Sequence, residues 1–154
     1  MHAIPNKRRS AFTLIEIMAV VVIIGLLMAI VGPRVLAVFD QGNVTTTGLQ
    51  LNSIKTALST YYMDNGRFPS TEQGLRALIE KPTTPPEARG WRPGGYLDGK
   101  TIPQDAWKQD FQYAYPGERN PDSYDLWSVG ADGQAGGSGT AADIGNWAAE
   151  DTAE

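Results

Sequence analysis

Residues 12–31 read FTLIEIMAVVVIIGLLMAIV, and this stretch decides the architecture of the chain. The run is apolar almost throughout and carries one charged residue, Glu16. At about 1.5 Å per residue, a helix of this length spans roughly 30 Å, the thickness of the hydrocarbon core of a bilayer. Three basic residues precede it at positions 7–9, and basic residues gather on the cytoplasmic side of membrane segments. The sequence therefore predicts one N-terminal transmembrane helix, with residues 1–11 in the cytoplasm.

The carboxylate of Glu16 helps to decide which role this segment has, because a charge inside a membrane is costly and needs a partner. A cleaved secretory signal has an apolar core of only about 7–15 residues and ends in small residues, whereas this run is longer and ends at Gly32-Pro33. A twin-arginine export signal or a plain membrane anchor leaves Glu16 without a role. A segment that packs against copies of itself offers a partner, the α-amino group made by cutting just before Phe12.

The residues around that cut are Lys7-Arg8-Arg9-Ser10-Ala11 followed by Phe12-Thr13-Leu14-Ile15-Glu16, and they resemble the cleavage site of type IV pilins and pseudopilins. The resemblance implies that prepilin peptidase cuts between Ala11 and Phe12 and methylates the new amine of Phe12. It also implies that Glu16 pairs with that amine on a neighbouring chain during assembly. The family prefers glycine before the cut, where this chain has the next-smallest residue, so we expect cleavage to persist at a lower rate.

The remaining residues, 34–154, are enough for one small domain with a modest core. The chain has no cysteine, and its single histidine, His2, lies in the basic leader. Loss of the leader therefore excludes Cys–His or Ser–His chemistry and any zinc site with histidine or thiolate ligands, and leaves only oxygen ligands for a hard cation. Without the three basic leader residues, 10 of the 13 remain against 17 acidic residues. This acidic balance argues against a nucleic-acid partner.

A second helical pattern continues from Pro33 to about Met63 and predicts one long helix. Its apolar stripe consists of Val44, Leu51, Ile54, Leu58 and Tyr61. Gly32-Pro33 predicts a kink or a melted turn, because proline removes a helix donor. Ser70 and Gln73 have the spacing of a capping box and predict a short helix over residues 71–80.

Two later segments, residues 111–115 and 123–129, alternate and are rich in aromatic residues, so they predict two strands. We expect a small antiparallel sheet packed on the long helix, an α+β fold. Residues 82–95 are rich in proline and glycine and predict a loop in which Trp91 covers the core. The same role, in the core or as cover of the sheet, is expected of Trp107, Trp127 and Trp147.

Residues 128–147 read SVGADGQAGGSGTAADIGNW, and so much glycine makes a defined loop conformation costly in entropy. A bound calcium ion is one way to order the loop, because Asp132 and Asp143 offer carboxylates and glycine-rich backbone can turn its carbonyls inward. On spacing alone, two aspartates in such a loop are more often solvated turn residues, and the segment is not an EF-hand.

Further motifs resemble the major pseudopilins of the type II secretion system, the general secretion pathway protein G family. They are Thr71-Glu72-Gln73-Gly74-Leu75, Pro103-Gln104-Asp105 with Trp107, Gly130-Ala131-Asp132-Gly133 and Asp143-Ile144-Gly145-Asn146-Trp147. The resemblance implies a calcium site with Asp132 and Asp143 as side-chain ligands and the carbonyls of Val129 and Gln134 beside them. Family members often carry further acids where this chain has Ser138, Ala141 and Ala142, and Pro-Trp-Gly where it has Ala106-Trp107-Lys108. Fewer acids should weaken calcium affinity.

The resemblance implies a structural subunit and not an enzyme, with residues 1–11 as leader, 12–33 as transmembrane and polymerisation segment, and 34–154 as periplasmic domain. Such a subunit forms a homopolymer that is assembled at the inner membrane and helps to export folded proteins. Its partners in assembly are minor pseudopilins and an assembly platform. The nearest alternative is a type IV pilin of a surface fibre, many of which close their C-terminal region with a disulfide that this chain cannot form. An anchored enzyme would need a carboxylate pair that nothing singles out, and an anchored calcium-binding module would leave Glu16 unexplained.

Overall fold

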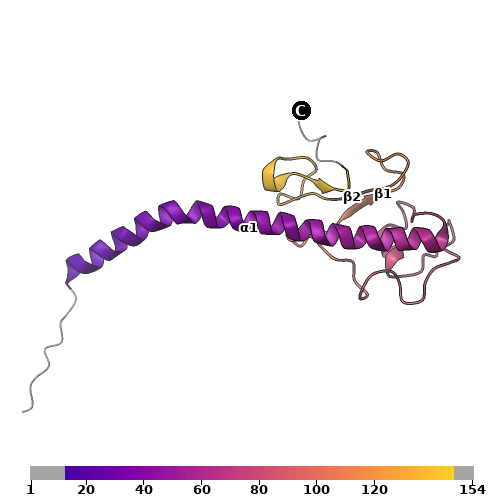
Figure 1. Cartoon of the computed structure of the whole chain (residues 1–154), viewed down its shortest axis with the longest axis horizontal. Helices are drawn as coiled ribbons and strands as arrows, with labels where there is room; N and C mark the ends of the chain where they lie inside the picture. Colours follow the sequence, from indigo (N-terminus) through magenta and orange to yellow (C-terminus); the bar gives the residue numbers. More distant parts are fainter. Residues whose placement is uncertain (1–12, 148–154) are drawn as a thin grey trace, which may run out of the picture. The chain divides into compact units, whose positions relative to one another are not determined.

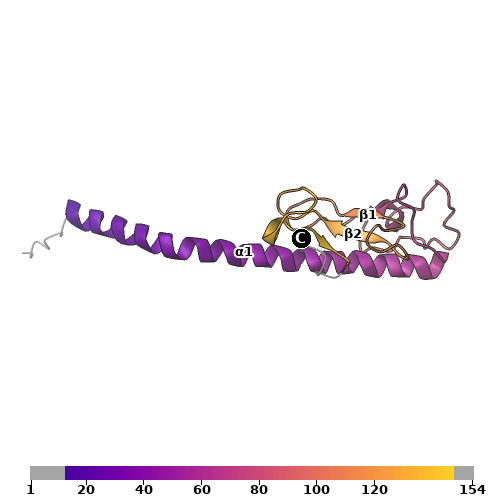
Figure 2. The same cartoon turned by 90° about the horizontal axis from the view of Figure 1, so that it is seen from above.

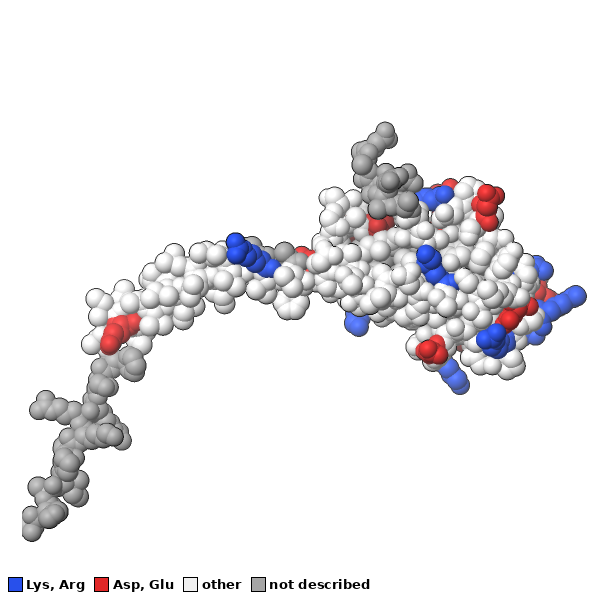
Figure 3. All heavy atoms as spheres, viewed as in Figure 1, with Lys and Arg blue, Asp and Glu red and all other residues white. Residues whose placement is uncertain are grey.

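The computed structural model describes residues 13–147 and divides into two compact units, Met1–Phe39 and Asp40–Glu154. Helix α1, Leu14–Asn65, contributes to both units. Its first part, Leu14–Gly32, has a mean hydropathy of 3.0 over 19 residues and is long and apolar enough to cross a membrane. The side chains of this part are not buried against any other described residue, and its surface is uncharged apart from the acidic patch near its start (Figure 3). The predicted apolar span is therefore present as a continuous helix.

The helix α1 continues through Gly32 and Pro33, so the chain does not melt into a turn at this pair. Proline removes one N–H donor from the ladder of helix hydrogen bonds, whereas the neighbouring residues keep theirs. The loss of one donor is small against the many remaining hydrogen bonds of a helix of 52 residues.

The part of α1 after Asp40 forms the base of the second unit, and the sheet and loops lie along it (Figures 1 and 2). Four residues of the predicted stripe are buried, Leu51, Ile54, Leu58 and Tyr61, while Val44 is half-buried. Full burial of a side chain of this size contributes about 1.5–3 kcal/mol. The predicted stripe is therefore the face on which the core is built.

A three-stranded antiparallel sheet completes that core, in the order β1 (Gln112–Ala114), β2 (Asp125–Ser128) and β3 (Ile144–Gly145). Tyr113 pairs with Leu126, and Leu126 is fully buried in the same cluster as the apolar face of α1. The two predicted strands and the α+β arrangement are confirmed. Strand β3 was not predicted, because two residues in a glycine-rich segment carry no alternating pattern.

The segment after Ser70 differs from the prediction, because residues 71–74 form turns and only a 3₁₀ helix, η1 (Leu75–Leu78), follows. The capping-box contacts are present: Ser70 N–H donates to Gln73 Oε1 at 3.1 Å, and Gln73 N–H donates to Ser70 Oγ at 3.3 Å. Gly74 has φ 55° and ψ −162°, which is not helical. The predicted α-helix over residues 71–80 was therefore wrong, because the backbone leaves the helical region one residue after the box.

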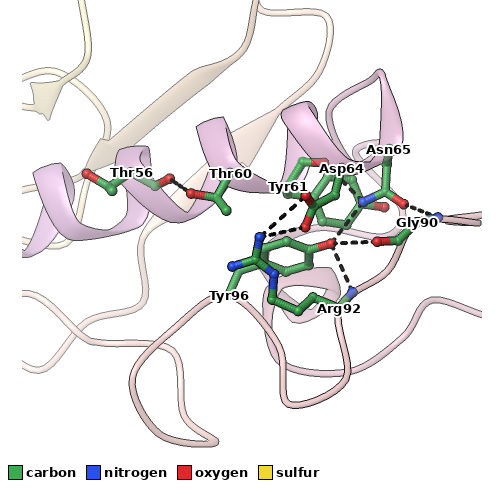
Figure 4. A network of polar contacts seen from close by, with 8 residues as sticks. All are labelled: Thr56, Thr60, Tyr61, Asp64, Asn65, Gly90, Arg92 and Tyr96. Carbon is green, nitrogen blue, oxygen red and sulfur yellow. Dashed lines mark hydrogen bonds and ion pairs between the residues drawn. The ribbon is translucent and has the colours of Figure 1, made fainter.

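The side chain of Asn65 joins the end of α1 to the loop that follows η1 by hydrogen bonds (Figure 4). Its Nδ2 donates to the hydroxyl of Tyr96 at 3.0 Å, and its Oδ1 accepts the N–H of Gly90 at 3.1 Å. Arg92 Nη2 lies 3.1 Å from Asp64 Oδ2. The predicted loop over residues 82–95 is thus held against the helix by specific polar contacts.

The tryptophans are half-buried rather than central to the core. Trp91 packs against the core and donates its Nε1–H to the carbonyl of Ala77 at 2.8 Å, so it covers the core as predicted. Trp127 lies on β2, with its ring centroid 5.9 Å from that of Trp147. These two rings cover the sheet, and Trp107 is half-buried in the turn before β1.

Candidate functional site

The first candidate site is the start of α1, where Thr13 and Glu16 form a reciprocal cap. The backbone N–H and the hydroxyl of Thr13 donate to Glu16 Oε2 at 2.8 and 2.9 Å, and the N–H of Glu16 donates to Thr13 Oγ1 at 3.4 Å. This is the capping-box pattern, which satisfies N–H groups that have no partner within the helix. The predicted cleavage residues Ala11 and Phe12 lie outside the described residues.

The carboxylate of Glu16 keeps room for a second partner. The residue is exposed, and within residues 13–147 the structure gives no hydrogen bond to its Oε1. An ionised carboxylate has about four acceptor positions over its two oxygens. A cationic donor from another chain can therefore bind the free oxygen while Thr13 still holds the other.

The second candidate site is the glycine-rich loop between β2 and β3, whose backbone is closed on itself. The N–H of Ala131 donates to the carbonyl of Thr140 at 3.0 Å, and the N–H of Asp143 donates to the carbonyl of Gly136 at 3.1 Å. The 3₁₀ turn η2 (Gly139–Ala141) contains Thr140 and lies between Gly136 and Asp143 in the chain. The loop thus brings the backbone next to Asp132 close to the backbone that leads into Asp143.

The two predicted carboxylates have different surroundings. Asp132 is exposed and its Oδ1 accepts the N–H of Gln134 at 3.1 Å, within its own turn. Asp143 is half-buried, and its Oδ1 is enclosed without a hydrogen-bond partner among the described residues. A buried polar atom without a partner is costly and marks a place where an ion or a water can bind. The structure records no contact between the two carboxylates.

Asp143 borders a hollow of about 330 Å³ beside the sheet. Arg119 lies over the ring of Trp147, with its Cζ 4.4 Å from the ring centroid. Asp125 is buried and accepts the N–H of Arg119 at 2.8 Å and that of Asn120 at 3.1 Å. The other residues of the hollow are Ala114, Glu118, Trp127 and Ala135. Sequence reasoning missed Arg119 and Asp125, because single charged residues carry no motif and Arg119 meets the distant Trp147 only in the fold.

The donor chemistry of the loop fits a hard cation, although the structure gathers few carboxylates there. Among residues 13–147, no group of three or more His, Cys, Asp or Glu side chains is placed to share a metal ion. The carbonyls of Val129 and Gln134 accept no hydrogen bond from the described residues and are thus available as oxygen ligands. A calcium ion here would depend on Asp143, Asp132 and backbone carbonyls, since Ser138 and its neighbours add no carboxylate.

Comparison with known proteins places the chain in a family. The family described as "Type II secretion system (T2SS), protein G" matches residues 34–147, and the "Prokaryotic N-terminal methylation motif" matches residues 6–32. The chain belongs to the type II secretion system protein G family. Within that family, the core protein G of Pseudomonas aeruginosa is 49% identical over 142 residues, covering 92% of this chain and 97% of that protein. The core protein G of Vibrio cholerae is 43% identical over 145 residues, covering 94% and 96%.

The protein G fold is also seen in a solved structure. The crystal structure of the major pseudopilin from the type 2 secretion system of enterohaemorrhagic Escherichia coli matches with a TM-score of 0.63 and 39% identity, covering 75% of this chain and 95% of that one. The predicted resemblance to pseudopilins is confirmed, and the alternative of a surface-fibre pilin is not favoured. The protein G family is one of structural pseudopilin subunits and not an enzyme family.

Proposed function

We propose that this chain polymerises into the pseudopilus of a type II secretion system as its major subunit and helps to export folded proteins across the outer membrane. Prepilin peptidase would cut between Ala11 and Phe12 and methylate Phe12. Residues 12–33 would then hold the subunit in the inner membrane as a single span, with residues 34–154 in the periplasm. Minor pseudopilins and the inner-membrane assembly platform would start and drive the polymer.

The observation that carries this proposal is the apolar helix Leu14–Gly32, which has no buried side chains and contains one carboxylate near its start. Large apolar side chains such as Leu26 and Met28 are 63% and 67% exposed, so water is an unfavourable surrounding for them. Lipid covers them in a single subunit, and the helices of other subunits cover them in a polymer. Only the second arrangement also gives Glu16 a partner of opposite charge.

The pairing of Glu16 with the amine of a neighbouring chain would decide the register of assembly. Apolar helices in lipid gain little from a hydrophobic effect between them, so packing and polar contacts specify how they associate. An ammonium group and a carboxylate attract strongly in that low-dielectric environment, and most strongly in direct contact. A misplaced neighbour would leave both charges without a partner.

We further propose that calcium binds the loop between β2 and β3 and orders it. The enclosed Oδ1 of Asp143 and the free carbonyls of Val129 and Gln134 support this proposal, with Asp132 as the second carboxylate. Calcium accepts about 6–8 oxygen ligands in flexible geometry, so a site that is rich in carbonyls and poor in carboxylates suits it better than it suits magnesium. The bound ion would supply the order that glycine-rich backbone lacks.

Crosslinking in the membrane tests the polymerisation. The chain has no cysteine, so an introduced pair provides the only thiols. We would combine Met18→Cys with a cysteine at Leu26, Leu27 or Met28, express each full chain with prepilin peptidase and the assembly platform, and oxidise the cells. A ladder of covalent oligomers is expected for at least one pair, and its loss when Glu16→Ala is added. Monomers alone from all three pairs would contradict the proposal.

A further inference from the structure

We propose that a closed ring of hydrogen bonds, formed by Asp105, Ser128, Gly130 and Gln109, positions the glycine-rich loop for its cation. In this ring Gln109 is a positioning residue that sets calcium affinity without touching the ion. The inference rests on the calcium proposal and adds to it the residues that hold the loop in shape.

One side of the ring runs through Ser128, the last residue of β2. Asp105 is 1% exposed, and its Oδ2 accepts the hydroxyl of Ser128 at 2.6 Å. The same Ser128 oxygen accepts the N–H of Gly130 at 3.1 Å. A buried carboxylate thus fixes Gly130, the second residue of the loop, through one serine.

The other side of the ring runs through Gln109. Asp105 Oδ1 accepts the backbone N–H of Gln109 at 2.8 Å, which completes a tight turn over residues 105–109. The side-chain Nε2 of Gln109 donates to the carbonyl of Gly130 at 2.9 Å. Both backbone groups of Gly130 are therefore held, and both connections lead back to one carboxylate.

Gly130 is the point at which the two ends of the loop touch. Its φ is +71°, and a Cβ added there would lie 2.8 Å from the carbonyl oxygen of Ala142 and 2.9 Å from that of Ala141. Ala142 directly precedes Asp143, and Gly130 precedes Asp132 by two residues. A shift of Gly130 therefore changes the separation of the two proposed carboxylate ligands.

The side chain of Gln109 also lies against the turn that carries Asp132. A Cβ added at Gly133 would lie 3.0 Å from Gln109 Oε1, so the amide contacts the loop on both sides of Asp132. Calcium ligands must reach the ion within about 2.3–2.6 Å. A loop already held in the binding geometry gives up less entropy when the ion binds. The ring thus provides preorganisation that the glycines alone cannot.

The test compares Gln109→Met with Gln112→Met in the full-length chain, purified in a nonionic detergent. Methionine keeps the length of the side chain and removes its N–H donor. Gln112 is exposed on β1, and its amide donates only to the carbonyl of Asp110 at 3.2 Å among the described residues, so it is a matched control. Calcium alone is titrated calorimetrically, and the melting midpoint is measured in chelator.

We expect Gln109→Met to raise the calcium dissociation constant by about three- to tenfold, the equivalent of one lost hydrogen bond. In chelator the melting midpoint should fall by no more than the few degrees that one such bond is worth. Amide hydrogen exchange over residues 130–143 in chelator should become faster. Gln112→Met should change none of these. A second variant, Gln109→Leu, removes the donor without adding a charge near the ion, and should behave like Gln109→Met.

Two results would overturn the inference, and they are distinguishable. If the parent binds calcium and both Gln109 variants bind it equally well, the ring does not position the loop although the calcium proposal stands. If the parent itself gives no calcium isotherm, the calcium proposal fails and the positioning role fails with it. A fall in the chelator midpoint with an unchanged dissociation constant would assign Gln109 to stability alone and count against the inference.

Discussion

Thr13 donates two hydrogen bonds to a single oxygen of Glu16, one from its backbone N–H at 2.8 Å and one from its hydroxyl at 2.9 Å. The only carboxylate of the apolar segment is therefore already engaged within its own chain. Such engagement lowers the penalty of holding a charge in lipid before any neighbour arrives. Together with the proposed pairing to another chain, this gives Glu16 two separable tasks, of which the structure shows the capping of its own helix.

Glu16→Ala should block polymerisation while leaving peptidase cleavage intact, because the cut lies on the far side of Phe12 from this side chain. Glu16→Gln separates the two tasks: glutamine serves a capping box as glutamate does but carries no charge for an ammonium partner. We expect both variants to be cleaved and neither to form polymer, as measured by gel mobility and by the crosslinking ladder. Polymer from Glu16→Gln would show that capping is sufficient. Uncleaved precursor from Glu16→Ala would show that the carboxylate acts earlier.

Asn65→Ala should loosen the contact between the end of α1 and the loop over residues 82–95. It removes the donor to Tyr96 and leaves the N–H of Gly90 without its acceptor (Figure 4). Loss of these partners should lower the free energy of unfolding by about 1–3 kcal/mol. Urea unfolding of the full chain, followed by tryptophan fluorescence, measures the change. Asn52→Ala, at an exposed position of the same helix, should stay within about 0.5 kcal/mol.

Alkaline pH should destabilise the domain through its buried tyrosines. Burial, and then the neighbouring Tyr124, raise the pKa of the Tyr113 hydroxyl well above its ordinary value of 10.0. This hydroxyl donates to the carbonyl of Pro69 at 2.8 Å and must stay protonated to do so. In the unfolded chain the same group ionises near pH 10, so the unfolded state binds fewer protons and stability falls as the pH rises above that value.

The corresponding variant is Tyr113→Phe. It should cost about 1 kcal/mol at neutral pH through the lost hydrogen bond, and its stability should fall less steeply above pH 10. Melting midpoints of parent and variant between about pH 8 and 11 measure both effects. Parallel curves for the two proteins would mean that other groups cause the alkaline loss.

Calcium should raise the melting midpoint of the full chain in detergent by several degrees. An ion at a hundred times its dissociation constant adds about 2.7 kcal/mol to the folded state. Asp143→Ala should abolish the rise, since it removes the enclosed oxygen, and Asp132→Ala should reduce it. Asp122→Ala, at an exposed position outside the loop, is the control. A rise that survives Asp143→Ala would place the ion elsewhere.

Several local features could be predicted because their cause lies within a few residues. The capping contacts of Ser70 with Gln73 follow from a spacing of three, and the buried stripe from Leu51 to Tyr61 follows from helical periodicity. The same reasoning failed just beyond Ser70, where Gly74 leaves the helical region and the amide of Gln73 donates to the carbonyl of Thr84 at 2.7 Å. A contact over eleven residues outweighed the local helical preference.

The sequence by itself determined three features: the apolar segment with its single carboxylate, the strands β1 and β2, and the oxygen-only ligand chemistry of the loop. Each follows from hydropathy, alternation or residue type, which are properties of neighbouring positions. Only the tertiary structure decided that Asp143 has an enclosed oxygen without a partner and that Asp105 holds Gly130 through Ser128 and Gln109. The hydrogen bonds from Ser128 to Asp105 and from Gln109 to Gly130 join residues more than twenty positions apart. The turn over residues 105–109 is held on α1, where the N–H of Ala106 donates to Thr47 Oγ1, and from there it reaches the loop. Burial leaves a polar group no solvent to replace a missing partner.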